Sequence, residues 1–164
     1  MNLENMNIGG MIKYHRRLKR MTQGELCKGI CSVTHLSKFE NYNKEVNEET
    51  VLLLLERLDI SIDSIQKASK DIGKELSNLL DAIVSFDKER ATESYKRLKG
   101  WEEYITFSNY ISLYHLYIYR YHLLMLDFEK ASKEQELIKQ ILNSFTQQEK
   151  EMYEYFNSIL HNSK

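Results

Sequence analysis

The stretch that most constrains the fold of this chain is residues 22–41, TQGELCKGICSVTHLSKFEN. Thr22 is a favourable N-cap, and Glu25 stands three residues later, which is the capping-box pattern. A helix is therefore predicted to begin at Gln23 and to end near Gly29. A second capped segment follows at once, so the stretch indicates two short helices joined by a tight turn.

The second segment divides its side chains between two faces. Ser32 is the next candidate N-cap, and the predicted helix runs to Asn41 with Leu36 and Phe39 on one side. The other side is a short, mixed, hydrogen-bonding surface that consists of Val33, Thr34, Ser37 and Lys38. Such a surface suits the major groove of DNA, which shows donors, acceptors and thymine methyl groups to entering side chains. The first helix would cross the phosphate backbone while the second reads bases.

These residues carry a family resemblance. Over roughly residues 8–60 the chain resembles the lambda-repressor-like helix-turn-helix domain, also called the XRE class, which has five helices. The one-residue-short turn in KGICSVTHLSKFEN is similar to that of the peptide-pheromone-responsive regulators of Gram-positive bacteria, the Rgg, NprR and PlcR type. The resemblance implies a DNA-binding domain at the N-terminus of this chain.

The resemblance also assigns roles to particular residues. Thr22 and Gln23 correspond to an anchor for phosphate and base edges, and Arg16 corresponds to an arginine that pairs with Glu40 near the end of the recognition helix. The loop after that helix could also touch phosphate. The residues expected at the DNA are Thr22, Gln23, Ser32, Val33, Thr34, Ser37, Lys38, Asn43 and Lys44.

Two positions depart from the family pattern. The family usually has Asn-Gly after the recognition helix, where this chain has Asn41 and Tyr42. Tyrosine disfavours the positive φ that glycine accepts there. Val46 stands where a proline usually precedes the fourth helix.

Charge is distributed unevenly along the chain. The net charge is only −1, which argues against binding polyanions with the whole surface. Residues 1–38 nevertheless carry +5, and residues 39–60 carry −4, so the recognition end is positive. The basic cluster at residues 16–20 has two interpretations: cations at a helix C-terminus are favourable in themselves, or they contact the DNA backbone.

The whole chain is predicted to be all-α. It contains no proline and six glycines, and its long charged side chains favour helices. Residues 1–7 are expected to be a frayed lead-in, and Ser61 to cap a short fifth helix that ends near Lys67. The predicted domains are a helix-turn-helix domain at residues 1–68 and a helical-repeat dimerisation and regulatory domain at residues 69–164.

From residue 71 onward the pattern changes to longer helices in pairs, beginning with a helix over residues 72–85. Residues 85–100 can be laid over residues 126–141, and each copy has an acidic corner followed by an alanine, Ala91 and Ala131. This spacing resembles tetratricopeptide-like antiparallel hairpins, although the tryptophan and proline of that motif are missing.

One long aromatic helix is expected over residues 102–126. Its tyrosines recur at helical spacing, so it is either a central scaffold helix or, with Asn109, one wall of a peptide-binding groove. The peptide-binding residues are unknown. A last helix over residues 147–160 has a predicted buried stripe of Met152, Tyr155, Phe156 and Ile159. The chain then stops halfway through a third pair, so it is a truncated form, or this helix caps the domain or pairs with another subunit.

Several classes of protein are excluded by what the sequence lacks. No apolar run approaches the ~20 residues of a membrane span, and residues 1–10 do not resemble a signal peptide, which predicts a cytoplasmic protein. Cys27 and Cys31 are expected to be reduced, and neither they nor His115 and His122 have the further ligands of a metal site. No catalytic constellation or cofactor motif is present, so an enzyme is not expected.

The leading hypothesis is a sequence-specific transcriptional regulator that binds double-stranded DNA through the major groove. It would act as a homodimer on a two-fold site, because one recognition helix reads too few bases to be selective. The resemblance adds a short signalling peptide as a candidate ligand of the C-terminal helices. The alternative is a protein-binding helical-repeat adaptor or antagonist that pairs with a related regulator.

Overall fold

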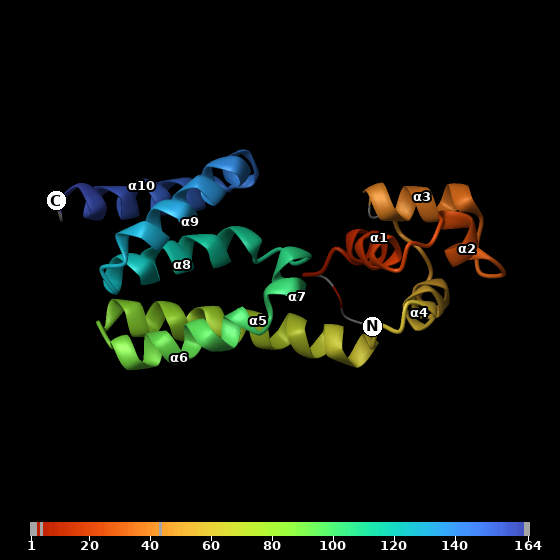
Figure 1. Ribbon diagram of the computed structural model, residues 1–164, viewed down its shortest axis with the longest axis horizontal. Coiled ribbons are helices and arrows are strands. Elements are labelled where there is room, and N and C mark those ends of the chain that lie inside the picture. The colour runs from red at the N-terminus through yellow and green to blue at the C-terminus, as the bar shows by residue number, and fades with distance from the viewer. Residues whose placement is uncertain (1–2, 4, 43, 163–164) are drawn as a thin grey trace. The chain divides into compact units, whose positions relative to one another are not determined.

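The computed structural model describes residues 3, 5–42 and 44–162, and within them the fold is all-α, as predicted. Contacts divide the chain into two compact units, Met1–Lys70 with Phe107–Asn109, and Asp71–Thr106 with Tyr110–Lys164. Figure 1 shows the helices in chain order. Their bounds are α1 Ile8–Leu18, α2 Gln23–Cys27, α3 Val33–Tyr42, α4 Glu48–Arg57, α5 Ile62–Val84, α6 Lys88–Lys99, α7 Glu102–Thr106, α8 Ile111–Leu124, α9 Phe128–Ile141, a 3₁₀ turn Leu142–Ser144, and α10 Gln147–Asn162.

The first unit is built from α1 to α4 and the beginning of α5. Local capping sets the helix starts: the side chains of Asn7 and Asn47 accept the amides of Gly10 and Thr50. α3 packs against α1 and α2, and α2 also packs against α4. The core is formed by Ile8, Met11, Ile12, Leu26, Leu36, Phe39, Val51, Leu54, Leu55, Leu58 and Ile65, all buried.

The expectation of a frayed N-terminal lead-in is wrong for residues 5–7. The amide of Asn7 donates to the carbonyl of Phe107 at 2.6 Å, and the amide of Asn109 donates to the carbonyl of Asn5 at 2.8 Å. Met6 faces Ser108 in an antiparallel bridge and is buried. Backbone pairing and burial of one methionine therefore hold this segment in the first unit, and nothing local in the sequence signals either.

The expected break between a fifth helix ending near Lys67 and another over residues 72–85 is also wrong, because α5 is continuous from Ile62 to Val84. The intervening residues contain no proline or glycine, and they continue the buried stripe through Ala68, so nothing ends the helix. That stripe consists of Ile65, Ala68, Ile72, Leu76, Leu79 and Ile83. The predicted domain boundary at residues 68 and 69 falls inside α5 and stays a prediction.

The single aromatic helix expected over residues 102–126 is instead two helices, α7 and α8. The break contains Ser108 and Asn109, residue types whose polar side chains compete for backbone hydrogen bonds, and the pairing with residues 5–7 uses the backbone groups that a helix would need. Three tyrosine hydroxyls of α8 have hydrogen-bond partners inside the protein: Tyr114 with Glu102, Tyr119 with Asn157, and Tyr121 with Thr92. These contacts favour the scaffold alternative, and the peptide-binding groove stays a prediction.

The second unit consists of helical pairs with matching turns. Phe86 has φ 57° between α5 and α6, and Leu126 has φ 59° between α8 and α9. The next residue in each turn caps the following helix: Asp87 accepts the amide of Arg90, and Asp127 accepts that of Lys130. The internal repeat seen in the sequence therefore coincides with two equivalent turns.

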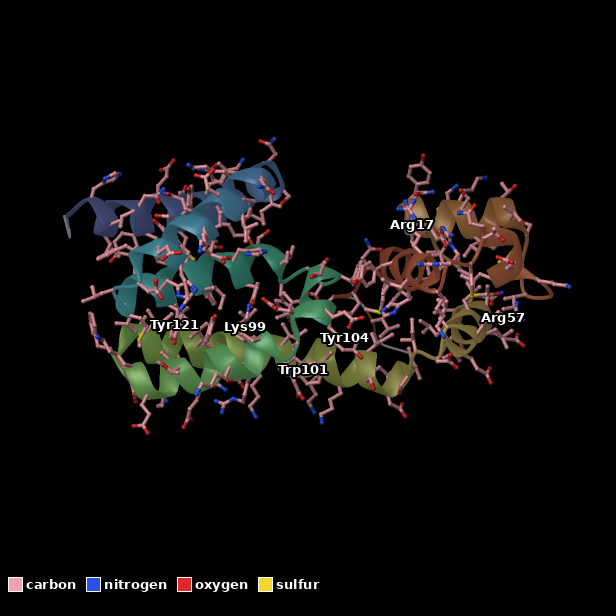
Figure 2. The ribbon with its side chains drawn as sticks, in the orientation of Figure 1. Arg17, Arg57, Lys99, Trp101, Tyr104 and Tyr121 are labelled. Atoms are coloured by element: carbon pink, nitrogen blue, oxygen red, sulfur yellow. The ribbon has the colours of Figure 1, made fainter. Side chains whose placement is uncertain are left out.

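Close packing completes the second unit. Ala91 and Ala131, the small residues of the repeat, are both buried on their helices. Figure 1 shows α9 lying beside α8, and the ring of Tyr95 on α6 stacks on Tyr121 of α8, which is labelled in Figure 2. Hydrophobic packing of α6, α9 and α10 around α8 therefore forms the core of this unit.

The stripe predicted for the last helix is partly wrong. Phe156 is buried, but Tyr155 is 63% exposed, and Tyr153 is buried in its place beside Tyr119. Periodicity alone could not distinguish two neighbouring aromatic residues, because the position of α8 decides which side of α10 is covered. Among the described residues, none of the helices has the length and apolar content needed to cross a lipid bilayer.

Candidate nucleic-acid interface

The turn between α2 and α3 is held by capping at both helices. Thr22 forms a capping box with Glu25: the Glu25 amide donates to Thr22 Oγ1 at 3.1 Å, and the Thr22 amide donates to Glu25 Oε2 at 2.6 Å. Gly29 lies in the turn with φ 75°, a conformation that glycine adopts without a steric penalty. Ser32 Oγ then accepts the amide of His35 and starts α3. The two helices therefore have defined ends on both sides of the turn.

α3 has one buried and one exposed face. Leu36 and Phe39 are buried against the rest of the first unit. Val33 is 48% exposed, Thr34 and Lys38 are exposed, and Ser37 is half-buried beside Asn41, whose Nδ2 donates to the Ser37 carbonyl at 2.9 Å. The structure thus places the predicted base-reading side chains together on the solvent side of a single helix.

A buried ionic network joins α1, α2 and α3. Arg16 Nε and Nη2 donate to the two carboxylate oxygens of Glu40 at 2.6 and 2.8 Å, and Arg16 Nη1 donates to the carbonyl of Met21. Gln23 Nε2 donates to Glu40 Oε2 at 2.8 Å. The side chains of Arg16 and Glu40 are only 10% and 0% exposed. A bidentate pair of this kind fixes geometry as well as charge.

The network decides the ionisation of both charged partners. Burial raises the pKa of Glu40, but the hydrogen bonds from Arg16 and Gln23 outweigh burial and leave the pKa below its usual value. The hydrogen bond to Glu40 raises the pKa of Arg16 despite its own desolvation. Both groups are therefore charged at neutral pH, and their attraction ties α3 to α1.

Glu40 also orients Gln23. Because the side-chain amide nitrogen of Gln23 donates to the carboxylate, its Oε1 is left as an acceptor and one amide hydrogen as a donor. Gln23 is half-buried, and it lies at the first position of α2, directly after the exposed Thr22. The arrangement holds a polar group at the start of α2, which is where the sequence predicted an anchor.

The loop after α3 is only partly described. Lys44 is exposed, and Asn43 lies outside the described residues. Tyr42 is the last residue of α3, and the positive-φ residues other than glycine in the described chain are Arg20, Asp59, Phe86 and Leu126. Tyr42 therefore avoids the conformation that the family's glycine would adopt, because the helix continues through it.

Two supporting contacts were missed by sequence reasoning. Arg57 Nη1 donates to the carbonyls of Leu26 at 2.8 Å and Lys28 at 2.6 Å, so a residue of α4 binds the C-terminal end of α2. Lys13 Nζ donates to Asn41 Oδ1 at 2.5 Å and links α1 to the end of α3. Neither contact has a local signal, because the partners lie about thirty residues apart in the chain.

The first unit also carries exposed cations outside α3. Arg17 near the end of α1 is exposed and is labelled with Arg57 in Figure 2. Lys28, in the turn, is also exposed. Positive side chains near a groove-reading helix supply the salt-dependent part of binding to a phosphate backbone.

Comparison with known proteins agrees with this geometry. The family model described as "Helix-turn-helix" matches residues 12–65. The transcriptional activator NprA of Geobacillus stearothermophilus is 25% identical over 139 residues, which cover 85% of this chain and 34% of that protein. The chain therefore spans about a third of the length of this relative. No solved structure matches significantly.

The capped pair α2 and α3, the buried network behind it and the family match all fall within the same segment. Residues 12–65 of this chain thus form a helix-turn-helix domain of the lambda-repressor-like (XRE) class, and the chain is similar to the transcriptional activator NprA over most of its length.

Proposed function

We propose that this protein is a transcriptional regulator that binds a specific DNA sequence by inserting α3 into the major groove. The observation that carries the proposal is the exposed face of α3, Val33, Thr34 and Lys38, supported from behind by the Arg16–Glu40 pair. Side chains on a rigid helix can reach base edges with defined geometry, and each good contact discriminates among bases. Thr22 and Gln23 at the start of α2 would anchor phosphate.

The regulator is proposed to bind as a homodimer on a two-fold site. A single recognition helix contacts a few base pairs, and two copies one helical turn apart multiply that selectivity. The resemblance to peptide-pheromone-responsive regulators supports a short peptide as effector of the C-terminal helical pairs. NprA is named a transcriptional activator, which supports a role in transcription for this chain as well.

The test is selection of bound sequences from a random duplex library by the purified chain at two salt concentrations. The wild-type protein is expected to enrich a two-fold motif whose binding weakens as salt rises. Thr34→Ala with Lys38→Ala should lose or relax the motif. Lys96→Ala is the control, because Lys96 is also an exposed lysine, in the last turn of α6 in the second unit.

A second candidate, a protein-binding antagonist of a related regulator, is favoured by one observation. Leu52 and Leu53 of α4 are 38% and 40% exposed, so part of an apolar helix lies at the surface. This candidate needs no DNA motif. Weak binding that salt abolishes, with no enriched sequence and no effect of the α3 substitutions, would exclude the regulator and support the antagonist.

A further inference from the structure

The helix-turn-helix unit contains a segment that lies far from residues 12–65 in the sequence. Phe107–Asn109 connects α7 to α8, both of which belong to the second unit, yet its contacts assign it to the first. It lies against residues 5–7, immediately before α1. We name these two paired segments, residues 5–7 and Phe107–Asn109, the clamp.

The clamp is small but specific. Two backbone hydrogen bonds, from Asn7 to Phe107 and from Asn109 to Asn5, flank the bridge between Met6 and Ser108. Met6 and Ser108 are 4% and 6% exposed, so the bridge is shielded from water. One aromatic contact adds to it, since the Phe107 ring lies 5.5 Å from that of Tyr14 on α1.

One residue of the clamp is also the cap of α1. Asn7 Oδ1 accepts the amide of Gly10 at 2.9 Å, and the carbonyl of Asn7 accepts the amide of Met11 at 3.1 Å. Its own amide is the one that donates to Phe107. The start of α1 is therefore held by the segment between α7 and α8, and α1 in turn carries Arg16, the partner of Glu40 on α3.

The chain on either side of the segment is held within the second unit. Ile105 of α7 is fully buried two residues before Phe107, and Tyr114 of α8 is buried with its hydroxyl donating to Glu102 of α7 at 2.7 Å. The chain between these anchors is short. If the spacing of α7 and α8 changes, residues 107–109 therefore have to move. Because Phe107 pairs with Asn7, that movement also affects the cap of α1.

We propose that the clamp is the regulatory connection through which the C-terminal helices control DNA binding. When the clamp is closed, α1 is capped and holds α3 through the Arg16–Glu40 pair; when α7 and α8 are rearranged, the clamp opens and DNA affinity falls. The proposal rests on the proposed DNA-binding function. A ligand shifts this equilibrium only if it binds one of the two states more tightly.

Opening the clamp does not require unfolding of the first unit. Two hydrogen bonds and one ring contact are few beside the packed core of α1 to α4, so the clamp can open as a local unit. Because the clamp has far fewer contacts than this core, it can open and act as a switch while the helix-turn-helix stays folded.

The first test opens the clamp in this chain of 164 residues. Asn109→Pro removes the amide that donates to Asn5, and Asn109→Ala is its matched control because it keeps that amide. Hydrogen exchange at the amides of Asn7, Gly10 and Met11 is expected to be about tenfold faster in the proline variant than in the alanine variant. Affinity for the duplex selected by the wild-type protein should fall at least about fivefold.

The second test closes the clamp again. Met6 and Ser108 face each other between the two hydrogen bonds, where Cα atoms of an antiparallel pair lie about 4.5 Å apart, within the range of a disulfide. Met6→Cys with Ser108→Cys is placed in a chain that carries Cys27→Ala and Cys31→Ser. Combined with Asn109→Pro, oxidation is expected to restore DNA affinity to within about twofold of the parent chain, and reduction to abolish the rescue.

The outcomes separate the clamp from the proposed function. Unchanged exchange in Asn109→Pro, or faster exchange with unchanged DNA affinity, overturns the regulatory role of the clamp. If Asn109→Pro does not fold, the disulfide variant with Asn109 intact decides, because oxidation must then slow exchange at Met11 without weakening DNA binding. If the wild-type chain selects no duplex, the proposed function fails and the regulatory role fails with it, whatever the exchange data show about the cap of α1.

Discussion

At the scale of single residues, Glu40 has the greatest influence on the candidate interface. It is buried, accepts two hydrogen bonds from Arg16 and one from Gln23, and lies on α3. Glu40→Gln would leave the Arg16 guanidinium buried without its counter-charge, so the free energy of unfolding at pH 7 should fall by about 3 kcal/mol. Urea denaturation measures the loss.

An exposed carboxylate provides the control for that substitution. Glu56→Gln on α4 changes the same chemical group where solvent surrounds it, and should change stability by less than about 0.5 kcal/mol. Equal losses in the two variants would mean that the Arg16–Glu40 pair does not stabilise the domain.

The lowered pKa of Glu40 predicts that the free energy of unfolding depends on pH. The pKa of Glu40 is lowered in the folded chain, so its contribution is complete above the pKa of an unfolded glutamate and disappears as pH falls through the lower, folded value. The difference in unfolding free energy between wild type and Glu40→Gln should stay constant from pH 7 to about 5 and shrink below about 4. Denaturation curves at four pH values would reveal it; a difference that grows in acid would contradict the sign.

At the scale of elements, the two equivalent turns of the second unit are strained. Leu126 has φ 59° and is 64% exposed, so its side chain contributes little burial while its backbone occupies the left-handed region. Leu126→Gly should therefore raise the free energy of unfolding, by up to about 1 kcal/mol. Thermal and urea denaturation both report this change.

A glycine placed inside a helix is expected to change the free energy of unfolding in the opposite direction. Leu137→Gly, at a 44% exposed position within α9, should lower stability by about 1 kcal/mol or more. Destabilisation by both substitutions would show that Leu126 is held by contacts that outweigh its backbone strain.

Elements were predictable where local signals decide them. Capping residues marked the starts of α2 and α3, and the predicted apolar positions of α3 are buried. The break at Phe107–Asn109 was not predictable, because its cause is a pairing with residues one hundred positions earlier. The continuity of α5 was missed for a related reason: a capping residue, Ser61, was visible, but no signal for a helix end follows it.

At the scale of the whole molecule, the salt dependence of DNA binding distinguishes the two interpretations of the basic cluster at the end of α1. Arg17→Gln should lower the magnitude of the slope of log affinity against log salt by about 0.9 for each bound copy of the chain, about 1.8 for the proposed dimer, if Arg17 neutralises a phosphate. If it only complements the helix end, stability falls slightly and the slope is unchanged. Arg90→Gln, an exposed arginine of α6, is the control and should leave the slope unchanged.

The sequence by itself determined the caps and the two faces of the helix-turn-helix, which follow from positions within twenty residues of one another. Such features depend on backbone hydrogen bonds and periodicity, which are local. The residues expected at DNA rest on the family resemblance and stay a prediction. Tertiary structure alone decided that Tyr153 rather than Tyr155 is buried, that Arg57 binds the end of α2, and that Phe107–Asn109 pairs with the segment before α1. Each of these depends on which surface another element covers, and that is set by the packing of distant segments.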